Sequence, residues 1–332
     1  MMFSYHFFRR IFVITIVLIS LLGFVGYLIR DPSVEWALLM YIPLIPLGIV
    51  VILLDLFLKG YSLSKFRYGL TFLGLVLILS EMFSMTGSLD LQHLPDPNTQ
   101  ISLLHWNVRW GGKNWKSIRE DIEQRHPDIL VISEPPPQPR VLEMANHLNY
   151  YILPYQEYSD GPIVVCSKWP LKLEQIPRIR KAEAMTVVVS TPQFPLRLLV
   201  IDGQRNMSSR IQLFSHEVSI PKALLPRSRT PMLIDIVEVL AVYHAQKRLI
   251  DVVVGDFNAL SRSLGFQPFT EIAGGYRLAS MLSRGWRGTW MSWMPLYDID
   301  HVWIHKRFSK METKLFTNFA TDHRGQEVFF SP

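Results

Sequence analysis

Three long apolar runs occupy the first quarter of the sequence. Residues 11–29 and 36–54 carry no charged side chain, and residues 68–85 carry only Glu81. A helix that spans a bilayer needs about 20 mostly apolar residues. The pattern therefore predicts a membrane region, residues 1–88, with three transmembrane helices. Their predicted positions are about 11–29, 36–55 and 68–86.

The flanking residues indicate how such helices are oriented. The first run also resembles a cleavable signal peptide, but it exceeds the usual signal core of about 7–15 residues and further apolar runs follow, so we predict a retained helix. Arg9 and Arg10 precede it, and Lys59, Lys65 and Arg67 lie between the second and third runs. By the positive-inside rule these residues are cytoplasmic. Three spans then make this an integral protein of a bacterial inner or plasma membrane with its remainder extracytoplasmic; two spans place the remainder in the cytoplasm.

After a linker at residues 89–100, which contains two prolines, the pattern changes to short apolar runs of strand length. The segment 101–332 has many predicted strands and few helices, which predicts an α/β (α+β) domain of packed sheets with helices outside. Strands are predicted at 101–107, 129–133, 163–167, 185–190, 196–201, 249–254 and 299–304, and helices at 115–126, 209–224 and 232–248.

Several of these strands end in polar side chains. The run 249–254 leads into Gly255-Asp256-Phe257-Asn258, and other apolar runs lead to Asn107 and to Glu134. A carboxylate at a strand end can bind a divalent cation or hold a water, and an amide can donate to an anionic oxygen. Taken singly, each residue also has a structural interpretation, such as an Asx turn or a loop cap. For Asp300 it is an ion pair with an arginine, and for His323 an ordinary surface histidine.

As an ordered set, these motifs resemble the endonuclease/exonuclease/phosphatase family over about residues 100–332. That family includes pancreatic deoxyribonuclease, abasic-site endonucleases, inositol-phosphate phosphatases and bacterial sphingomyelinases. The resemblance implies a four-layer αββα sandwich with the active site at one rim, and Mg²⁺ or Mn²⁺ as cofactor. It implies metal ligands at Asn107, Glu134 and Asp322, a water-activating base at Asp256, phosphate contacts from Asn258 and His323, and an Asp300 that holds His323.

The sequence departs from the family pattern after the strand at 196–201. Many members carry a histidine there that contacts the scissile phosphate, whereas this chain continues Asp202-Gly203-Gln204-Arg205-Asn206. We therefore expect Asp202, Arg205 or Asn206 to bind substrate in its place. His301 stands where members usually have an aromatic residue, and an imidazole can keep that packing role.

Together these features predict a membrane-anchored phosphoesterase that hydrolyses a phosphodiester or phosphomonoester. The candidate substrates are nucleic acid, a phospholipid headgroup and a small phosphate ester, and the lipid bilayer is the other partner.

The net charge of +6 gives only mild attraction to phosphate. The single cysteine, Cys166, excludes an intrachain disulfide. Late tryptophans (Trp286, Trp290, Trp293, Trp303) fit either packing or stacking on a base or sugar. The main alternative is a non-catalytic binding or sensor protein that keeps the fold, which the missing histidine favours.

Overall fold

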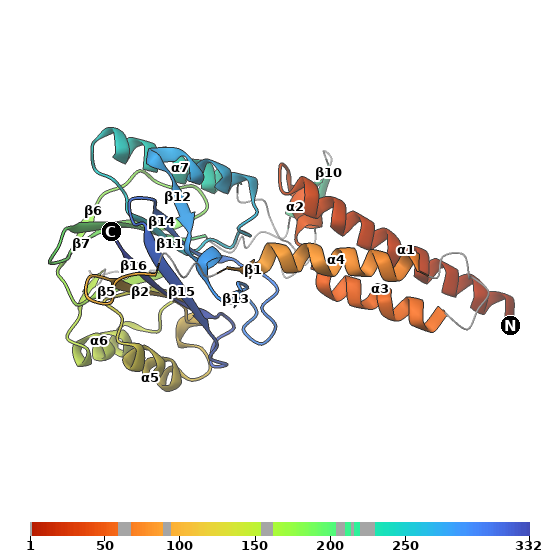
Figure 1. The fold of residues 1–332 in the computed structure, drawn as a ribbon, viewed down its shortest axis with the longest axis horizontal. Helices are drawn as coiled ribbons and strands as arrows, with labels where there is room; N and C mark the ends of the chain where they lie inside the picture. Colours follow the sequence, from red (N-terminus) through yellow and green to blue (C-terminus); the bar gives the residue numbers. More distant parts are fainter. Residues whose placement is uncertain are drawn as a thin grey trace. The chain divides into compact units, whose positions relative to one another are not determined.

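The computed structural model of this protein forms two compact units (Figure 1). The helical unit comprises Met1–Met85 with Met207–Ser228, and the sandwich unit comprises Thr86–Asn206 with Arg229–Pro332. The structure describes residues 2–58, 68–88, 94–153, 162–203, 210–213, 216–219 and 230–332. Lys59, Lys65, Arg67, Arg205 and Asn206 lie outside the described residues.

Within the described part of the helical unit, one helix is long and apolar enough to cross a membrane. This is α1 (Met2–Ile29), which qualifies over Arg10–Ile29. Helices α2 (Val34–Met40) and α3 (Leu44–Leu58) qualify only as a pair, bent by 58°. Helix α4 (Gly69–Met85) has 17 residues, which is below the required length. The prediction of three transmembrane helices is therefore not supported as made.

The second predicted span is interrupted at Pro43, which directly precedes α3. A proline disfavours helical backbone in the residue before it and supplies no N–H to the preceding turn. Sequence hydropathy does not register this break, because proline leaves the run uncharged. The apolar segment 36–55 therefore folds as two helices and not as one straight helix.

Polar side chains inside the helical unit bind neighbouring helices. Glu81, the only charge in the third apolar run, is buried and accepts a 2.7 Å hydrogen bond from the backbone N–H of Ile45, in the first turn of α3. The first N–H groups of a helix have no partner within it, and an anion there is favourable. Tyr27 Oη donates to the carbonyl of Ser80 at 2.8 Å, which joins α1 to α4.

The sandwich unit contains two six-stranded sheets. The first has the order β12-β14-β11-β8-β7-β6 and the second the order β15-β16-β2-β3-β5-β4. The first sheet consists of β6 (Leu171–Glu174), β7 (Glu183–Ser190), β8 (Pro195–Asp202), β11 (Val252–Asp256), β12 (Tyr276–Leu278) and β14 (Asp300–His305). The second consists of β2 (Ile101–Asn107), β3 (Ile129–Ser133), β4 (Tyr151–Leu153), β5 (Ile163–Ser167), β15 (Lys310–Phe316) and β16 (Gly325–Ser331).

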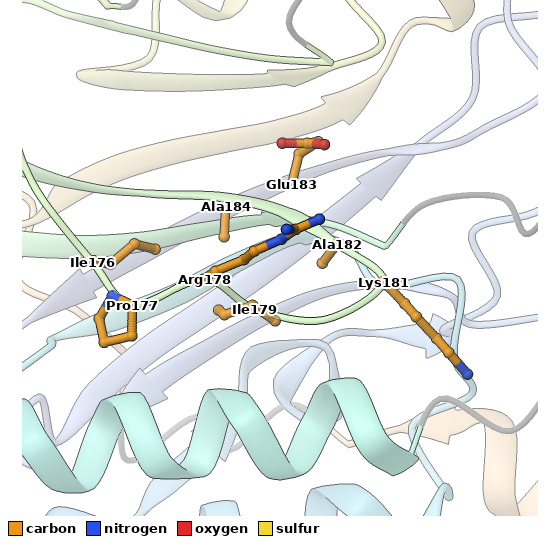
Figure 2. Close-up of a pocket in the computed structure, with 8 residues that line it drawn as sticks. All are labelled: Ile176, Pro177, Arg178, Ile179, Lys181, Ala182, Glu183 and Ala184. Carbon is orange, nitrogen blue, oxygen red and sulfur yellow. The ribbon is translucent and has the colours of Figure 1, made fainter.

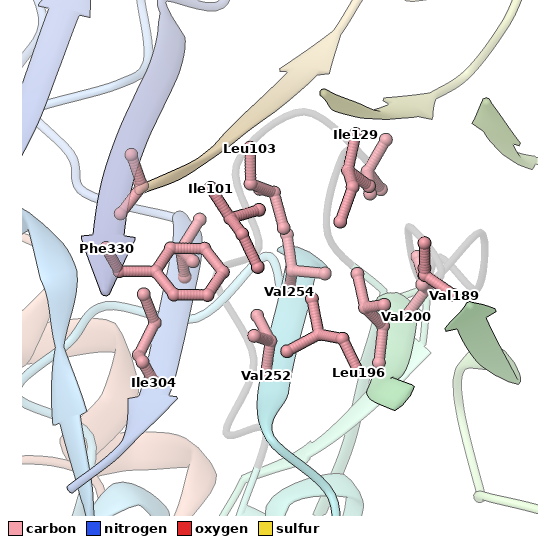
Figure 3. Close-up of a cluster of buried hydrophobic side chains, with 14 of the residues drawn as sticks. Ile101, Leu103, Ile129, Val189, Leu196, Val200, Val252, Val254, Ile304 and Phe330 are labelled. Carbon is pink, nitrogen blue, oxygen red and sulfur yellow. The ribbon is translucent and has the colours of Figure 1, made fainter. Parts of the chain in front are cut away.

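Apolar side chains form a core between the sheets and one outside each of them. Along β2, Ile101 and Leu103 face the other sheet, whereas Leu104 and Trp106 pack outward, as the two-residue repeat of a strand requires. Valines and isoleucines of both sheets fill the inner core (Figure 3). Helices α5 (Trp115–Arg125) and α6 (Gln138–His147) cover the second sheet, and α7 (Thr230–Ala245) covers the first. The structure thus has the predicted αββα layers.

Shorter elements complete the described structure. The predicted helix at 209–224 is wrong, because its described residues form an antiparallel pair of strands, β9 (Arg210–Leu213) and β10 (His216–Ser219). The alternation of polar and apolar residues in Arg210-Ile211-Gln212-Leu213 is a strand pattern. A second small pair joins β1 (Thr86–Gly87) to β13 (Gly285–Trp286). Short 3₁₀ helices occupy Arg109–Gly111, Leu264–Thr270, Ile272–Gly274 and Ala279–Leu282.

Candidate active site

At one rim of the sandwich, the last inward-facing residue of several strands is polar. On β11, Val252 and Val254 belong to the inner core, and Asp256 is the next residue on that face. The strand register pairs Asp256 with Asp300 of β14 and with Asp202 of β8. Residues directly opposite each other in a sheet point to the same face. Three acidic side chains on adjacent strands therefore occupy one row where the apolar core ends.

Asn107 connects this row to the second sheet. It is the last residue of β2, and its Nδ2 donates to Asp256 Oδ2 at 2.9 Å and to Glu134 Oε1 at 3.3 Å. Its Oδ1 accepts a 2.9 Å hydrogen bond from the backbone N–H of Arg109. All three side chains, Asn107, Glu134 and Asp256, are buried. The two sheets are thus bridged by a polar contact at the predicted site.

The backbone after β11 forms a tight turn that holds Asn258. Asp256 Oδ1 accepts a 2.9 Å hydrogen bond from the N–H of Asn258, whose backbone is left-handed (φ 50°). The Asn258 amide donates to the carbonyl of Gly203 at 2.7 Å. At Gly255 (φ 149°), a Cβ would lie 1.8 Å from the carbonyl oxygen of Ile201, so only glycine fits. Asp256 and Asn258 therefore form an Asx turn, and the same two residues are the ones predicted to act on the substrate.

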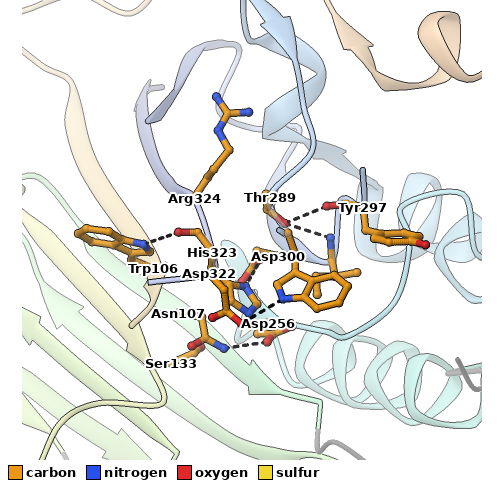
Figure 4. A network of polar contacts seen from close by, with 12 residues as sticks. Trp106, Asn107, Ser133, Asp256, Thr289, Tyr297, Asp300, Asp322, His323 and Arg324 are labelled. Atoms are coloured by element: carbon orange, nitrogen blue, oxygen red, sulfur yellow. Dashed lines mark hydrogen bonds and ion pairs between the residues drawn. The ribbon is translucent and has the colours of Figure 1, made fainter. Parts of the chain in front are cut away.

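Asp300 and His323 form a buried pair beside Asp256 (Figure 4). His323 Nδ1 lies 2.9 Å from Asp300 Oδ2. Thr289 Oγ1 accepts the N–H of Asp300 at 3.2 Å, and Gln326 donates to the Asp300 carbonyl at 2.5 Å. The backbone of the pair is thus held from two other segments. No sequence pattern marks Thr289 or Gln326, which sequence reasoning missed.

Burial and mutual charge shift the pKa values of these three groups. Burial raises the pKa of Asp256 to about 7, and the negative charge of Asp300 adds to the effect. Burial alone would raise the pKa of Asp300, but the positive charge of His323 outweighs it and the pKa is lowered. Burial opposes the charged form of His323, but the Asp300 carboxylate prevails and raises its pKa to about 9. At neutral pH the site therefore holds an imidazolium–carboxylate pair next to a carboxyl group near its midpoint.

Asp322, next to His323 in the sequence, is partly exposed. Its Oδ2 is 3.4 Å from the guanidinium of Arg109 and 3.4 Å from Trp290 Nε1. Its Oδ1 is buried and accepts no hydrogen bond from the described residues. Sequence reasoning did not select Arg109, although its position two residues after Asn107 is a usable signal. Trp290 is one of the late tryptophans whose sequence pattern fits either packing or stacking.

Of the three predicted substrate-binding residues, the described structure includes only Asp202. It is buried and lies directly beside Asp256 in the register of β8 and β11. His301, on the opposite face of β14, packs against the rings of Phe257 and Phe266 with centroids 5.5 and 5.0 Å apart. It keeps the packing role expected of the aromatic residue it replaces.

Two sets of residues could hold a metal ion at this rim. Asp256, Asp300 and His323 each offer a ligand atom within 4.8 Å of the others. The His323 nitrogen that faces Asp300 already contacts that carboxylate. This trio is therefore better suited to transferring protons and stabilising charge than to binding a metal. In the other set, Glu134 and Asp322 offer carboxylate oxygens, and Asn107 offers its Oδ1, which has a second lone pair besides the one that accepts the N–H of Arg109. Hard divalent cations prefer oxygen ligands. The buried Oδ1 of Asp322 fits such a role, because a cation would satisfy it.

A pocket of about 150 Å³ lies where the chain enters β7 (Figure 2). Residues 176–179 and 181–184 line it, and among them Glu183 pairs with Asp202 of β8. None of the predicted site residues lines this pocket. The chemistry at the rim is therefore not explained by this cavity.

Comparison with known proteins identifies the class of protein that this fold and site define. The sequence profile described as the Endonuclease/Exonuclease/phosphatase family matches residues 104–323, which is more than half of the chain. The chain belongs to this family, whose members are metal-dependent phosphoesterases. The prediction of an enzyme that hydrolyses phosphate ester bonds is confirmed at this level. Curated protein sequences give no match.

Solved structures agree with the fold. TDP2 from Caenorhabditis elegans is similar with a TM-score of 0.50 and 15% identity, over 91% of this chain and 94% of that one. The 3' phosphatase NExo from Neisseria, bound to a product DNA hairpin, is similar with a TM-score of 0.50 and 14% identity, over 70% of this chain and 100% of that one. At these identities the likeness shows the fold alone.

Proposed function

We propose that this protein is a membrane-anchored, divalent-metal-dependent phosphoesterase whose attacking water is activated by Asp256. The observation that carries the proposal is the buried convergence of Asp256, Asn107 and the Asp300–His323 pair, from both sheets, at one rim. Burying several ionisable groups together is unfavourable unless they are paired. Such an arrangement is expected at a functional site, where shifted pKa values support chemistry.

Asn107, Glu134 and Asp322 would hold Mg²⁺ or Mn²⁺. A bound divalent cation would neutralise charge on the phosphoryl oxygens. The contact between Asn107 and Glu134 already brings two of the three residues together. Asp322 adds a second carboxylate from the loop before β16.

The side chains of the protein supply the remaining chemistry. Asp256, with a pKa near 7, can accept a proton from a water molecule at neutral pH. His323 in its charged form can donate to a phosphoryl oxygen, and Asp300 keeps it charged and oriented. Asn258, held in the turn after β11, supplies a second donor through its amide.

The alternative is a non-catalytic binding or sensor protein. The observation in its favour is Asp202, a carboxylate at the position where many family members have a phosphate-contacting histidine. A carboxylate next to Asp256 repels a phosphate unless a cation lies between them. Turnover of a phosphate ester by the metal-loaded protein separates the two functions, because a sensor would bind metal or phosphate without hydrolysis.

Replacing Glu134 with Gln is expected to weaken Mg²⁺ binding without unfolding the sandwich unit. The substitution keeps the shape of the side chain and its contact with Asn107, and removes the negative charge that a hard cation requires. Calorimetric titration of Mg²⁺ into the variant and the parent measures the difference. Glu143→Gln, on the solvent side of α6, is the matched control and should bind Mg²⁺ like the parent. Equal affinity in the Glu134 variant would remove Glu134 from the ligand set.

Membrane topology gives a separate prediction. Arg9 and Arg10 favour a cytoplasmic N-terminus, so either one span (α1) or three spans place residue 332 outside the cytoplasm, whereas two spans place it inside. We expect a periplasmic reporter fused after residue 332 to be active and a cytoplasmic reporter at the same point to be inactive. The opposite pattern would contradict an extracytoplasmic catalytic domain.

A further inference from the structure

Exposed aromatic side chains gather around the candidate active site. In the described part of the sandwich unit, the exposed aromatic residues are Trp110 (51%), Tyr151 (52%), Trp293 (64%) and Phe319 (73%). Trp110 follows Asn107 by three residues, and Phe319 precedes Asp322 by three. Trp293 belongs to the loop that carries Trp290, whose indole contacts Asp322. Three of the four exposed aromatic residues therefore flank one site.

Backbone hydrogen bonds join the three loops that carry these residues. The N–H of Lys113 donates to the carbonyl of Ala320 at 2.7 Å, which ties the Trp110 loop to the Phe319 loop. The N–H of Ser292 donates to the carbonyl of Asp322 at 2.7 Å, which ties the Trp293 loop to the same segment. The three loops are thus joined to one another, and we call their exposed aromatic residues the aromatic rim (Trp110, Trp293 and Phe319).

The backbone at Trp110 lies in the left-handed region. Residues 109–112 all have positive φ, with values of 46°, 58°, 92° and 57°. A bulky residue in this conformation costs free energy, of order 1–3 kcal/mol. The exposed indole recovers little of that cost by burial. The N–H of Trp110 donates to the carbonyl of Glu134 at 2.6 Å, so the turn is held beside the candidate site while the indole stays exposed.

The chemistry around the rim fits the surface of an anionic bilayer. Arg109 and Lys113 are exposed on the Trp110 loop, and Met294 is exposed beside Trp293. Aromatic and apolar side chains next to basic ones favour the boundary between headgroups and acyl chains. Single-stranded nucleic acid also stacks on aromatic residues, but that mode uses a positively charged groove. Here Arg109 is already near Asp322, so of these two cations Lys113 is the one left to attract an anionic partner, and a single lysine does not form such a groove.

The path of the chain also favours a bilayer. Helix α4 ends at Met85, and β1 begins at the next residue. The sandwich unit follows in the same chain. A chain anchored by α1 would therefore keep the sandwich unit within reach of a bilayer surface.

We propose that the aromatic rim inserts into the surface of an anionic lipid bilayer and presents the active site to phosphate esters of lipid headgroups. The choice of substrate rests on the proposed function, whereas the insertion of the rim does not. The two parts therefore need separate measurements.

The first measurement is the depth of the rim in a bilayer, and it requires no activity. Trp293→Cys and Phe319→Cys, with Tyr151→Cys as the exposed control away from the site, are spin-labelled in the full-length chain. Cys166 is buried, and the labelling level of the unmodified chain shows whether it reacts.

The labelled proteins are reconstituted in vesicles of phosphatidylglycerol and phosphatidylcholine. We expect labels at 293 and 319 to be more accessible to oxygen than to a water-soluble nickel complex, and the label at 151 to show the reverse. Labels at 293 and 319 that behave like the one at 151 would overturn the proposal. So would protection of those labels by a single-stranded oligonucleotide but not by lipid.

The second measurement is hydrolysis by a triple variant, Trp110→Ser, Trp293→Ser and Phe319→Ser. Turnover is measured on long-chain phosphatidylglycerol in vesicles and on a short-chain, water-soluble form with the same headgroup. Because binding to a bilayer scales with the apolar area inserted, we expect a loss of roughly 10-fold or more on vesicles and little change on the soluble form. Tyr151→Ser should match the parent on both. Equal losses on both substrates would overturn the lipid role. A parent inactive on both would count against the proposed lipid chemistry, while the labels would still decide the insertion.

Discussion

Turnover is expected to fall by about 10²–10⁴-fold when Asp256 is replaced with Asn, because the variant can no longer accept a proton from the attacking water. The amide keeps the size of the carboxylate and can still accept the N–H of Asn258, and the Asn107 amide has to turn over to keep its contact with the new NH2 group. Substrate binding should change far less, because the lost interaction belongs to the transition state. Steady-state kinetics of the parent and the variant on the same phosphate ester measure both quantities.

Stability separates this role of Asp256 from a purely structural one. Because the folded protein raises the pKa of Asp256 to about 7, the metal-free folded state loses stability as the pH rises from about 4 to about 7, the range over which only the unfolded chain is ionised. Asp256→Asn removes that loss, so its melting temperature at neutral pH should equal or exceed that of the parent. Asp251→Asn is the control, because Asp251 is also buried and immediately precedes β11 at the opposite end from the site. It should leave turnover unchanged. An inactive Asp256 variant with a collapsed melting temperature would instead make Asp256 a structural turn residue.

Removal of His323 is expected to lower both activity and stability. His323→Ala takes away the charged donor at the phosphoryl oxygen, which costs turnover about 10²–10³-fold. It also leaves Asp300 as a buried carboxylate without its 2.9 Å partner, which typically costs about 3–5 kcal/mol of unfolding free energy. The loss should be smaller at acidic pH, because an unpaired buried Asp300 has a higher pKa and can take up a proton. Denaturant unfolding at two pH values measures it.

A second substitution distinguishes the two effects of His323. The double variant Asp300→Asn, His323→Ala has no buried charge at this position, so it should recover much of the lost stability. Its turnover should remain as low as that of the single variant. Recovery of turnover together with stability would show that His323 acts only through folding and not on the phosphate.

Much of the fold and of the candidate site could be predicted from the strands in the sequence. Alternation in Val252–Asp256 and in Ile101–Asn107 fixes which side chains face the inner core, and the same alternation puts Asp256 and Asn107 where that core ends. Their hydrogen bond across the two sheets follows from this placement and from the packing of the sheets. Composition alone would not have revealed it, because the contact joins residues 149 positions apart.

Other features depend on tertiary structure that no local pattern encodes. The apolar run 36–55 satisfies a hydropathy criterion, but backbone sterics at Pro43 divide it into α2 and α3. Thr289 holds Asp300 from a loop that has no regular pattern. The 210–219 segment contains apolar residues at spacings that suit either a helix or strands, and its pairing partner decides between them.

Metal-dependent turnover by the full-length protein in detergent tests the central claim most directly. Phosphomonoesters, a phosphodiester, single-stranded DNA and a phospholipid are incubated with Mg²⁺, with Mn²⁺ or with EDTA, for the parent and for Asp256→Asn. The account predicts hydrolysis of at least one of these esters with a divalent metal, its loss in EDTA, and its loss in the variant. A folded parent that binds the metal and hydrolyses none of them would contradict it, as would hydrolysis that persists in EDTA and in Asp256→Asn.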